Sequence, residues 1–404
     1  MRICLVYQGE FPPAERIEKT AKSLSAAGHQ VFLLCNNYGN FPLHEEQVAA
    51  LHTLRILPTF RNRTLNKIIK FPIFANPVWI AQLIAMIKRF QIEALQVVDI
   101  PLSVAVLWVA RSFGLPVVLD MWENYPEALR GWGRTDWKTR VFKNYRVARA
   151  VELWVTRRMD HIITVVEEQK ERLVADGVPA QHISVVTNGF DEELFTAGNL
   201  ESKTAMDLET GAYNLLYVGA VTPERGLEDV IRALKFVLPV VPNSRLYIAG
   251  SGPFESRLRD IAAENDVTRA VHFLGWVRFA DIRSYVAKSD LCLVPHVRND
   301  FIDTTMPNKI FQYMWMSRPV LVSNAKPLAR IVKECGGGFV FRSGDPEDAA
   351  AKILEAYSMR NDSEIGRRGH DLVMQKYTWE HCALGLLNVY EQLALSSAAS
   401  EHKK

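Results

Sequence analysis

Two stretches of the sequence carry basic side chains where a protein could hold phosphate groups. In the first, Gly219 closes an apolar run, and a loop through Thr222 leads to Arg225 at the start of a helical pattern. The guanidinium group of Arg225 offers a rigid fork of donors that suits phosphate oxygens. A cation at this point can reach a diphosphate leaving group. The plainer alternative is a solvated arginine at the start of a helix.

The second stretch is TMPNK at residues 305–309, which has the pattern of a helix start. Thr305 suits the cap and Pro307 suits the first turn. The amides of Asn308 and Lys309 would then point at an anion, with the helix dipole behind them. Lys309 would add a charge-assisted contact, and an ordinary capped helix is the alternative.

Further polar and glycine positions follow apolar runs elsewhere in the chain. The turn at 250–253 (GSGP) includes Gly252, and its glycines allow a ligand to approach the backbone closely. In the first half, Asp120 and Glu123 stand where a strand gives way to a loop, and the carboxyl end of a parallel strand is where ligands bind. Both acids are therefore candidates for substrate contact, with helix capping as the alternative.

These residues need a parallel sheet to position them, and the hydrophobic pattern predicts one in each half. Short apolar runs alternate with helical patterns, which indicates doubly wound α/β domains. We expect strands at 3–7, 30–35, 94–98, 117–120, 161–165 and 183–187, and again at 213–219, 245–249, 271–273, 291–295 and 320–323. We predict a first domain over 1–195, a linker over 196–212, a second domain over 213–378, and a final helix and tail over 379–404 that return to the first domain. The dinucleotide fingerprint G-x-G-x-x-G is absent after the first strand, which disfavours an NAD enzyme.

Composition agrees with two soluble globular domains. The chain has 404 residues, 48% hydrophobic and 23% charged, which excludes fibrous and disordered classes. Its five cysteines are scattered and indicate neither a disulfide framework nor a zinc site. No signal peptide opens the chain, and the longest apolar stretch, at 71–87, is interrupted by prolines and polar residues. We therefore expect a cytoplasmic protein.

The net charge of +3 hides a basic segment. Residues 51–158 hold 17 lysines and arginines against 7 aspartates and glutamates, interleaved with aromatic residues. This composition suits an anionic membrane surface, and a solvated helix face is the alternative. No nucleic-acid fold motif is present, so we expect no nucleic-acid partner.

Five segments of the chain resemble the family 4 glycosyltransferases, retaining enzymes of the GT-B fold that use nucleotide-sugar donors. The segments are 185–191 (VVTNGFD), 217–227 (YVGAVTPERGL), 246–253 (LYIAGSGP), 271–277 (VHFLGWV) and 305–314 (TMPNKIFQYM). The resemblance implies two Rossmann-like domains facing a cleft, with the donor, a UDP- or GDP-sugar, on the second domain. It also implies a glycan or lipid-linked acceptor on the first, no cofactor and no metal.

The resemblance also implies roles for individual residues. Arg225 and Lys309 would stabilise the leaving diphosphate, and Glu123 would act at the acceptor. Gln312 would hold the nucleotide ribose through its amide. The donor contacts implied are Gly219, Thr222, Gly252, Val277, Thr304, Thr305, Asn308 and Gln312.

Several positions depart from the family pattern. Ala220 stands where the family has an arginine, and Trp122 stands where many relatives have a histidine. Thr304 and Gln312 stand where the family has two glutamates. These departures keep open a catalytically silent relative that serves a glycan-synthesis complex. A sugar-nucleotide epimerase of the same fold and a membrane adaptor are further alternatives.

Overall fold

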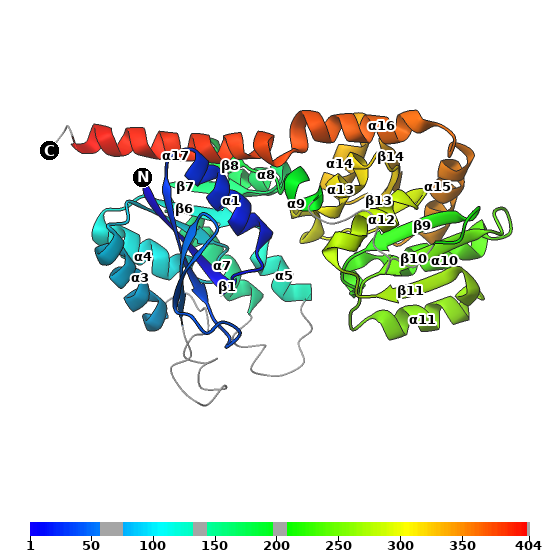
Figure 1. Ribbon diagram of the computed structural model, residues 1–404, viewed down its shortest axis with the longest axis horizontal. Helices are drawn as coiled ribbons and strands as arrows, with labels where there is room; N and C mark the ends of the chain where they lie inside the picture. Colours follow the sequence, from blue (N-terminus) through cyan, green and yellow to red (C-terminus); the bar gives the residue numbers. More distant parts are fainter. Residues whose placement is uncertain (57–75, 132–143, 197–207, 402–404) are drawn as a thin grey trace. The chain divides into compact units, whose positions relative to one another are not determined.

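The chain folds into two compact units (Figure 1). The computed structural model describes residues 1–56, 76–131, 144–196 and 208–401. Unit 1 consists of Met1–Thr187 with Cys382–Lys404, and unit 2 of Asn188–His381. Most of the predicted linker, residues 197–207, lies outside the described residues.

Unit 1 is built on an eight-stranded sheet in the order β3-β4-β2-β1-β5-β6-β7-β8. All neighbouring strands are parallel except β3 and β4, which pair antiparallel. The strands are β1 (Arg2–Glu10), β2 (Gln30–Asn36), β3 (Glu45–Val48), β4 (Leu51–Ile56), β5 (Ala94–Val98), β6 (Val117–Met121), β7 (His161–Thr164) and β8 (Ile183–Val185). Every residue of β5, β6 and β7 is buried, as expected for a parallel sheet covered on both faces.

The helices of unit 1 follow the strands with which they pack. They are α1 (Glu15–Ala26), α3 (Pro77–Phe90), α4 (Ser103–Phe113), α5 (Tyr125–Gly131), α7 (Tyr145–Thr156) and α8 (Glu167–Ala175). Asn76 caps α3 and Asn144 caps α7 through side-chain oxygens, the interaction that satisfies free amides at a helix start. The helices α3, α4 and α7 share one apolar core with the sheet.

Unit 2 has a six-stranded parallel sheet in the order β11-β10-β9-β12-β13-β14. Its strands are β9 (Tyr213–Val218), β10 (Ser244–Ala249), β11 (Val271–Gly275), β12 (Leu291–Val294), β13 (Val320–Ser323) and β14 (Gly338–Phe341). The helices are α9 (Glu192–Thr196), α10 (Leu227–Val237), α11 (Glu255–Glu264), α12 (Ile282–Ala287), α13 (Lys309–Trp315), α14 (Lys326–Cys335), α15 (Pro346–Ser358) and α16 (Ser363–Leu372). The helices α10, α11 and α15 pack on one core with β9 and β10.

Residues 188–195, which the sequence placed in the first domain, belong to unit 2. The amide of Phe190 donates to the carbonyl of Tyr377 at 2.6 Å, and the amide of Trp379 donates back to Phe190 at 2.7 Å. The Phe190 ring also stacks on Trp315, with centroids 4.8 Å apart. Packing against residues far along the chain sets this boundary, and local sequence does not show it.

The last helix, α17 (Trp379–Glu401), begins in unit 2 and continues into unit 1 from Cys382. Within unit 1 the hydroxyl of Tyr390 donates to the Gln96 side chain of β5 at 2.6 Å. Both residues are buried, so this hydrogen bond ties the helix to the middle of the sheet.

All five cysteines are free. Across the described ranges no helix is long and apolar enough to cross a membrane, and no three or more His, Cys, Asp or Glu side chains gather as metal ligands.

We expect unit 1 to lose stability as the pH falls from about 6.5 to 4. Burial lowers the pKa of His161, the first residue of β7, from its ordinary value of 6.5 to about 4. The folded state therefore favours the neutral ring, so its contribution is present above the ordinary pKa and is lost as the pH falls toward the folded one. A His161→Gln variant can still bond Ser184, which the ring contacts at 2.9 Å, and should show a shallower decline. Melting temperatures of the two proteins between pH 7 and pH 4 check this, and parallel declines would contradict it.

Candidate functional site

Two glycine turns meet at the carboxyl ends of β9 and β10 in unit 2. The amide of Gly219 donates to the carbonyl of Ala249, and the amide of Val221 donates to that of Ser251. A Cβ atom at Gly252 would collide with the backbone carbonyl of Val221. Glycine is therefore required there because the two loops lie in direct backbone contact.

The loop after β12 packs against the loop after β9 and positions Arg225, which lies on the β9 loop. Gly226 has a left-handed φ of 67°, and a Cβ atom there would collide with the carbonyl of Pro295 just after β12. The amide of Val297 donates to the carbonyl of Glu224 at 2.9 Å. These contacts hold Arg225 beside His296, with its Nη1 3.2 Å from the Nε2 of the ring.

His296 is a site residue that the sequence analysis missed. Its side chain is 1% exposed. Because Nε2 accepts from the guanidinium of Arg225, the ring hydrogen must lie on Nδ1, and Nδ1 has no partner among the described residues. Burial, aided by the charges of Lys309 and Arg225, lowers the pKa of His296 well below its ordinary value, so the ring is neutral. The signal available was a polar residue directly after an apolar strand, the rule already applied to Asp120 and Glu123.

Lys309 completes the group as the first residue of α13. The hydroxyl of Tyr313 on the same helix accepts a hydrogen bond from the amide of Val218 at 3.0 Å, which fixes α13 at the end of β9. The Nζ atom of Lys309 lies 4.0 Å from the centroid of the Tyr217 ring. Burial lowers the pKa of Lys309 well below its ordinary value, and the charge of Arg225 lowers it further.

Arg225, His296 and Lys309, here called the basic cluster, contact no carboxylate in the part of the chain that the structure describes. The Nε atom of Arg225 is itself buried and without a hydrogen-bond partner there. Holding cationic groups together in low dielectric is costly unless an anion compensates them. The arrangement therefore suits an anionic ligand at the carboxyl end of β9.

We expect a Gly219→Ala variant to lose ligand binding at the basic cluster. Gly219 has a φ of 138°, and an added Cβ atom would lie 2.6 Å from the Nζ atom of Lys309. The ammonium group would have to move, because the backbone around Gly219 is held by the β10 turn. Thermal-shift titration with nucleotides measures the loss of binding. Gly211→Ala is a matched control, because the φ of Gly211, 80°, is also left-handed. A Cβ atom added at Gly211 meets no atom within 4 Å. Equal nucleotide affinity in both variants would contradict the expectation.

The helix start at residues 305–309 differs from the prediction. Thr305 is not the cap, because α13 begins at Lys309 and Asn308 occupies the N-cap position with a helical φ of −58° and no side-chain capping bond. The segment before the helix is held differently, by the side chain of Asn188, which donates to the carbonyl of Met306 at 2.8 Å. A helical start at Thr305 would forgo this long-range contact.

Thr304 and Gln312, at the positions where the family has glutamates, have different surroundings in the structure. The hydroxyl of Thr304 faces the carbonyls of Asp300 and Phe301, so it is engaged within its own turn. Neighbouring Asp303 accepts from the amide of Lys326 at 2.8 Å, which gives that carboxylate a structural partner. Gln312 is half-buried, and its side-chain amide has no hydrogen bond within the described ranges.

The loop after β11 carries an exposed aromatic ring. Trp276 is 74% exposed, so its ring does not pack into the core. Val277 beside it is half-buried, and Thr222 in the β9 loop is half-buried as well. A flat apolar ring at a strand end in a parallel sheet can stack on another ring.

In unit 1, Asp120 is part of a buried network. Its carboxylate accepts from the guanidinium of Arg16 at 2.9 Å, from the Gln96 amide at 3.1 Å and from the indole of Trp122 at 3.0 Å. Asp120 is 2% exposed and Arg16 is 8% exposed. The carboxylate is buried and bonded by three internal side chains, so Asp120 serves the fold of this strand end.

Glu123 instead lies beside Asp99, a residue that the sequence analysis did not select. Asp99 follows β5, has a left-handed φ of 55°, and accepts from the amide of Trp122 at 2.8 Å. Burial, reinforced by the negative charge of Glu123, raises the pKa of Asp99 well above its ordinary value, and burial also raises that of Glu123. These two carboxyls, here called the carboxyl pair, lie at the point where the strand order reverses between β1 and β5, where a substrate can hydrogen-bond to them.

Comparisons with known proteins match both units. Residues 13–189 match the family model of the glycosyl transferase 4-like domain, and residues 212–359 match that of glycosyl transferases group 1. An uncharacterized glycosyltransferase of Methanocaldococcus jannaschii is 26% identical over 251 residues, which are 60% of this chain and 62% of the relative. A glycogen synthase of Mycobacterium tuberculosis is 26% identical over 61% of this chain and 57% of the relative. The chain thus spans about three fifths of the length of the curated relatives it matches.

Solved structures share the whole fold. Sucrose-phosphate synthase from Thermosynechococcus elongatus has a TM-score of 0.77 at 16% identity, covering 98% of this chain and 100% of its own. Anabaena HepE in complex with UDP has a TM-score of 0.68 at 14% identity, covering 97% and 100%. The predicted GT-B architecture, two parallel-sheet α/β domains, is confirmed.

Proposed function

The chain belongs to the glycosyltransferases, and from this premise we propose that it moves a sugar from a nucleotide-sugar donor to a glycan or lipid-linked acceptor, with retention of the anomeric configuration. The observation that carries the proposal is the basic cluster. Arg225, His296 and Lys309 converge beside the β9–β10 glycine turns without a carboxylate in the described ranges. A nucleoside diphosphate supplies the missing negative charge.

In the proposed reaction, the bond between the anomeric carbon of the sugar and the diphosphate oxygen breaks, and the diphosphate leaves with an added negative charge. Arg225 and Lys309 stabilise that charge as it develops, which is the differential stabilisation that accelerates transfer. His296 accepts from Arg225 at 3.2 Å and so orients the guanidinium, while its Nδ1 hydrogen is left for another acceptor. The acceptor hydroxyl bonds to the anomeric carbon on the face that the diphosphate leaves, and it passes its proton to the departing phosphate oxygen, which has gained the negative charge.

The remaining donor contacts follow from the geometry. The amide of Gln312 is unengaged and suits the ribose hydroxyls, and the exposed ring of Trp276 suits stacking on the base. The hydroxyl of Thr304 donates to the carbonyl of Asp300 within its own turn. The hydroxyls of the donor sugar therefore bind to other residues. Titration with UDP- and GDP-sugars distinguishes uracil from guanine as the base of the donor.

On the acceptor side we propose the carboxyl pair as the hydroxyl-binding group. Glu123 and Asp99 follow β6 and β5, and a carboxyl group in either protonation state can hydrogen-bond to a sugar hydroxyl. Asp120 is left out of this role because it is buried and its carboxylate already accepts from Arg16, Gln96 and Trp122.

Transfer is proposed to need no metal, since Arg225 and Lys309 supply the cationic charge at the diphosphate. Equal transfer rates with Mg²⁺ and with EDTA would agree with this. A rate that depends on a divalent cation would show that the basic cluster is not sufficient.

The basic segment offers a proposed anionic membrane less unpaired positive charge than the sequence indicated. Several arginines of residues 51–158 pair with acids outside that segment, Arg55 with Glu46, Arg89 with Glu45, and Arg111 with Asp160. The segment's excess charge is therefore partly cancelled in space. We keep a cytoplasmic protein, peripheral at the inner face of the membrane, as the proposal.

Nucleotide binding tests the proposal directly. UDP-, GDP- and ADP-sugars are titrated by thermal shift against the whole chain. At 100 times its dissociation constant, the true donor should stabilise the folded state by about 2.7 kcal/mol. One responding nucleotide supports a donor site, whereas no response at millimolar concentration would rule it out.

Turnover then separates the alternatives. Transfer to an acceptor with the responding donor supports the enzyme, and donor binding without turnover identifies the catalytically silent partner. Change of the free nucleotide sugar in the absence of an acceptor would identify an epimerase.

A further inference from the structure

An apolar groove lies among the helices of unit 1. It has a volume of about 770 Å³ and is lined by Ile80, Val104, Ala105, Leu107, Trp108, Arg111, Trp154 and Arg158. These eight residues come from α3, α4 and α7 and from the turn after α7. We call it the tryptophan groove. Its volume lies in the range of sites that bind small ligands.

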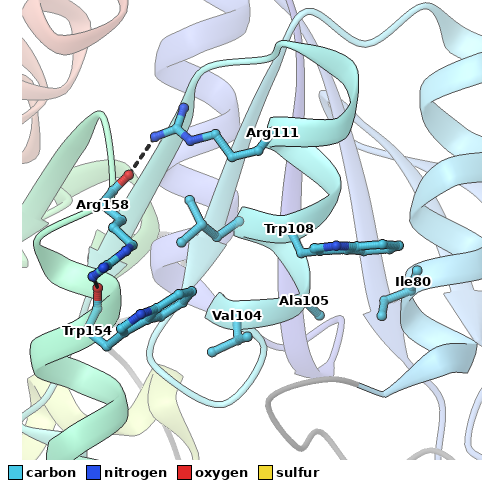
Figure 2. A pocket seen from close by; sticks show the side chains of 8 residues that line it. Ile80, Val104, Ala105, Trp108, Arg111, Trp154 and Arg158 are labelled. Atoms are coloured by element: carbon cyan, nitrogen blue, oxygen red, sulfur yellow. Dashed lines mark hydrogen bonds between the residues drawn. The ribbon is translucent and has the colours of Figure 1, made fainter.

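The two tryptophans are unusual in their exposure. Trp108 is 58% exposed and Trp154 is 45% exposed, although both carry large apolar rings. Figure 2 shows the indole rings on either side of the groove, with Val104 between them. An indole with an apolar body and a polar N–H suits a boundary between hydrocarbon and water, so this arrangement favours an apolar ligand whose end is polar.

The two arginines of the groove differ in whether a carboxylate neutralises their positive charge. Arg111 forms a bidentate ion pair with Asp160, with contacts of 3.0 and 3.1 Å, and is neutralised. Arg158 lies over the Trp154 ring, 4.6 Å from its centroid, and donates to the Trp154 carbonyl at 2.9 Å. It has no carboxylate partner among the described residues, and it is drawn beside that ring in Figure 2. One uncompensated positive charge therefore stands at the end of an apolar groove.

We propose that the tryptophan groove binds the hydrocarbon chain of an anionic lipid, with the lipid phosphate against Arg158. The apolar lining of the groove contacts the hydrocarbon chain of the lipid, and burial of this hydrocarbon chain contributes about 0.8 kcal/mol per methylene. The guanidinium of Arg158 meets the phosphate with charge-assisted hydrogen bonds. A docked protein surface fits less well, since stable interfaces use about 20–30 residues a side.

The site is independent of the basic cluster, which lies in unit 2, so it can be tested without a nucleotide. The probe is dodecyl phosphate below its micelle concentration, titrated into the whole chain by calorimetry. Inorganic phosphate carries the charge alone, and octaethylene glycol dodecyl ether carries the hydrocarbon chain with neither a charge nor a sugar. We expect dodecyl phosphate to bind at least tenfold more tightly than either.

Two variants locate the binding. Trp108→Ser removes one wall of the groove, and because the ring is 58% exposed the variant should fold. Arg158→Gln removes the charge and leaves both tryptophan rings in place. Each should weaken dodecyl phosphate about tenfold or more, whereas Phe113→Ser on α4 and Arg146→Gln on α7, outside the lining, should not.

The outcomes separate the possible occupants. Vesicles of phosphatidylcholine with phosphatidylglycerol should bind the wild type and release the Arg158→Gln variant. Equal affinity for inorganic phosphate would leave only an anion site and overturn the proposal. Binding that the two groove variants do not change, or concentration-dependent dimerisation that Trp108→Ser abolishes without any lipid binding, would overturn it too.

Discussion

Replacing Arg225 with alanine is expected to lower the rate of sugar transfer by about two to three orders of magnitude, the usual cost of removing one donor from a developing oxyanion. Lys309→Ala should have a comparable effect, because its ammonium group is the other cation within reach of Tyr217 and the β9 turn. The loss should fall mainly on kcat, since the negative charge on the diphosphate grows as the sugar leaves. Steady-state kinetics with the responding donor measure both parameters.

Controls make this result specific to the cluster. Arg269→Ala removes an exposed arginine from the turn before β11, at the opposite end of the strands, and should leave kcat unchanged. Arg225→Lys keeps a charge but loses the planar fork, and should recover only part of the rate. His296→Phe removes the acceptor that orients Arg225, and it should lower kcat less than Arg225→Ala does. Full activity in Arg225→Ala would mean that the basic cluster does not contact the leaving group.

Asp120→Ala is expected to destabilise unit 1 by about 3–5 kcal/mol, because it removes the carboxylate that the buried Arg16 guanidinium bonds. Arg16 is 8% exposed, and its guanidinium also donates to the Val186 carbonyl at 3.0 Å. Trp122 and Gln96 would lose their acceptor as well. Urea denaturation followed by a probe in unit 1 measures the change, since the two units need not unfold together.

A double replacement tests the cause of that loss. Arg16→Met with Asp120→Leu removes both charges and should recover most of the lost stability, because no unpaired charge remains. The exposed pair Arg245 with Glu209, at 2.6 Å in unit 2, provides the control. Breaking it with Glu209→Ala should cost under about 1 kcal/mol. A loss in Asp120→Ala no larger than in this control would show that the buried pair is not structural.

The sequence could predict the sheet of each unit because parallel strands covered on both faces are continuous apolar runs. It missed β3 and β4, whose residues include Glu45, Glu46, His52 and Arg55. There the charges pair within the sheet edge, with His52 on Glu45 at 2.8 Å and Arg55 on Glu46 at 2.7 Å. It also missed β14, a short strand beginning at Gly338. Polar or short strands lack the local periodicity on which such predictions depend.

In the candidate site too, the sequence predicted some features and the tertiary structure decided others. The sequence by itself determined the glycine turns, Arg225 and Lys309, because tight backbone approach and a cation after a strand each need a particular residue type at a particular place. The tertiary structure decided the rest: that His296 orients Arg225, that Asp99 meets Glu123, that Thr305 caps nothing, and that Asp120 is consumed by Arg16.

The basic segment shows the physical reason most simply. Along the sequence, residues 51–158 carry an excess of positive charge, yet Arg55, Arg89 and Arg111 find their carboxylates outside it. Residue type and local spacing are properties of the chain, so the sequence determines the strands and the turns. Hydrogen-bond partners, ion pairs and the proton on a buried carboxyl depend on distances of a few ångströms between residues far apart in the chain, and folding alone sets those distances.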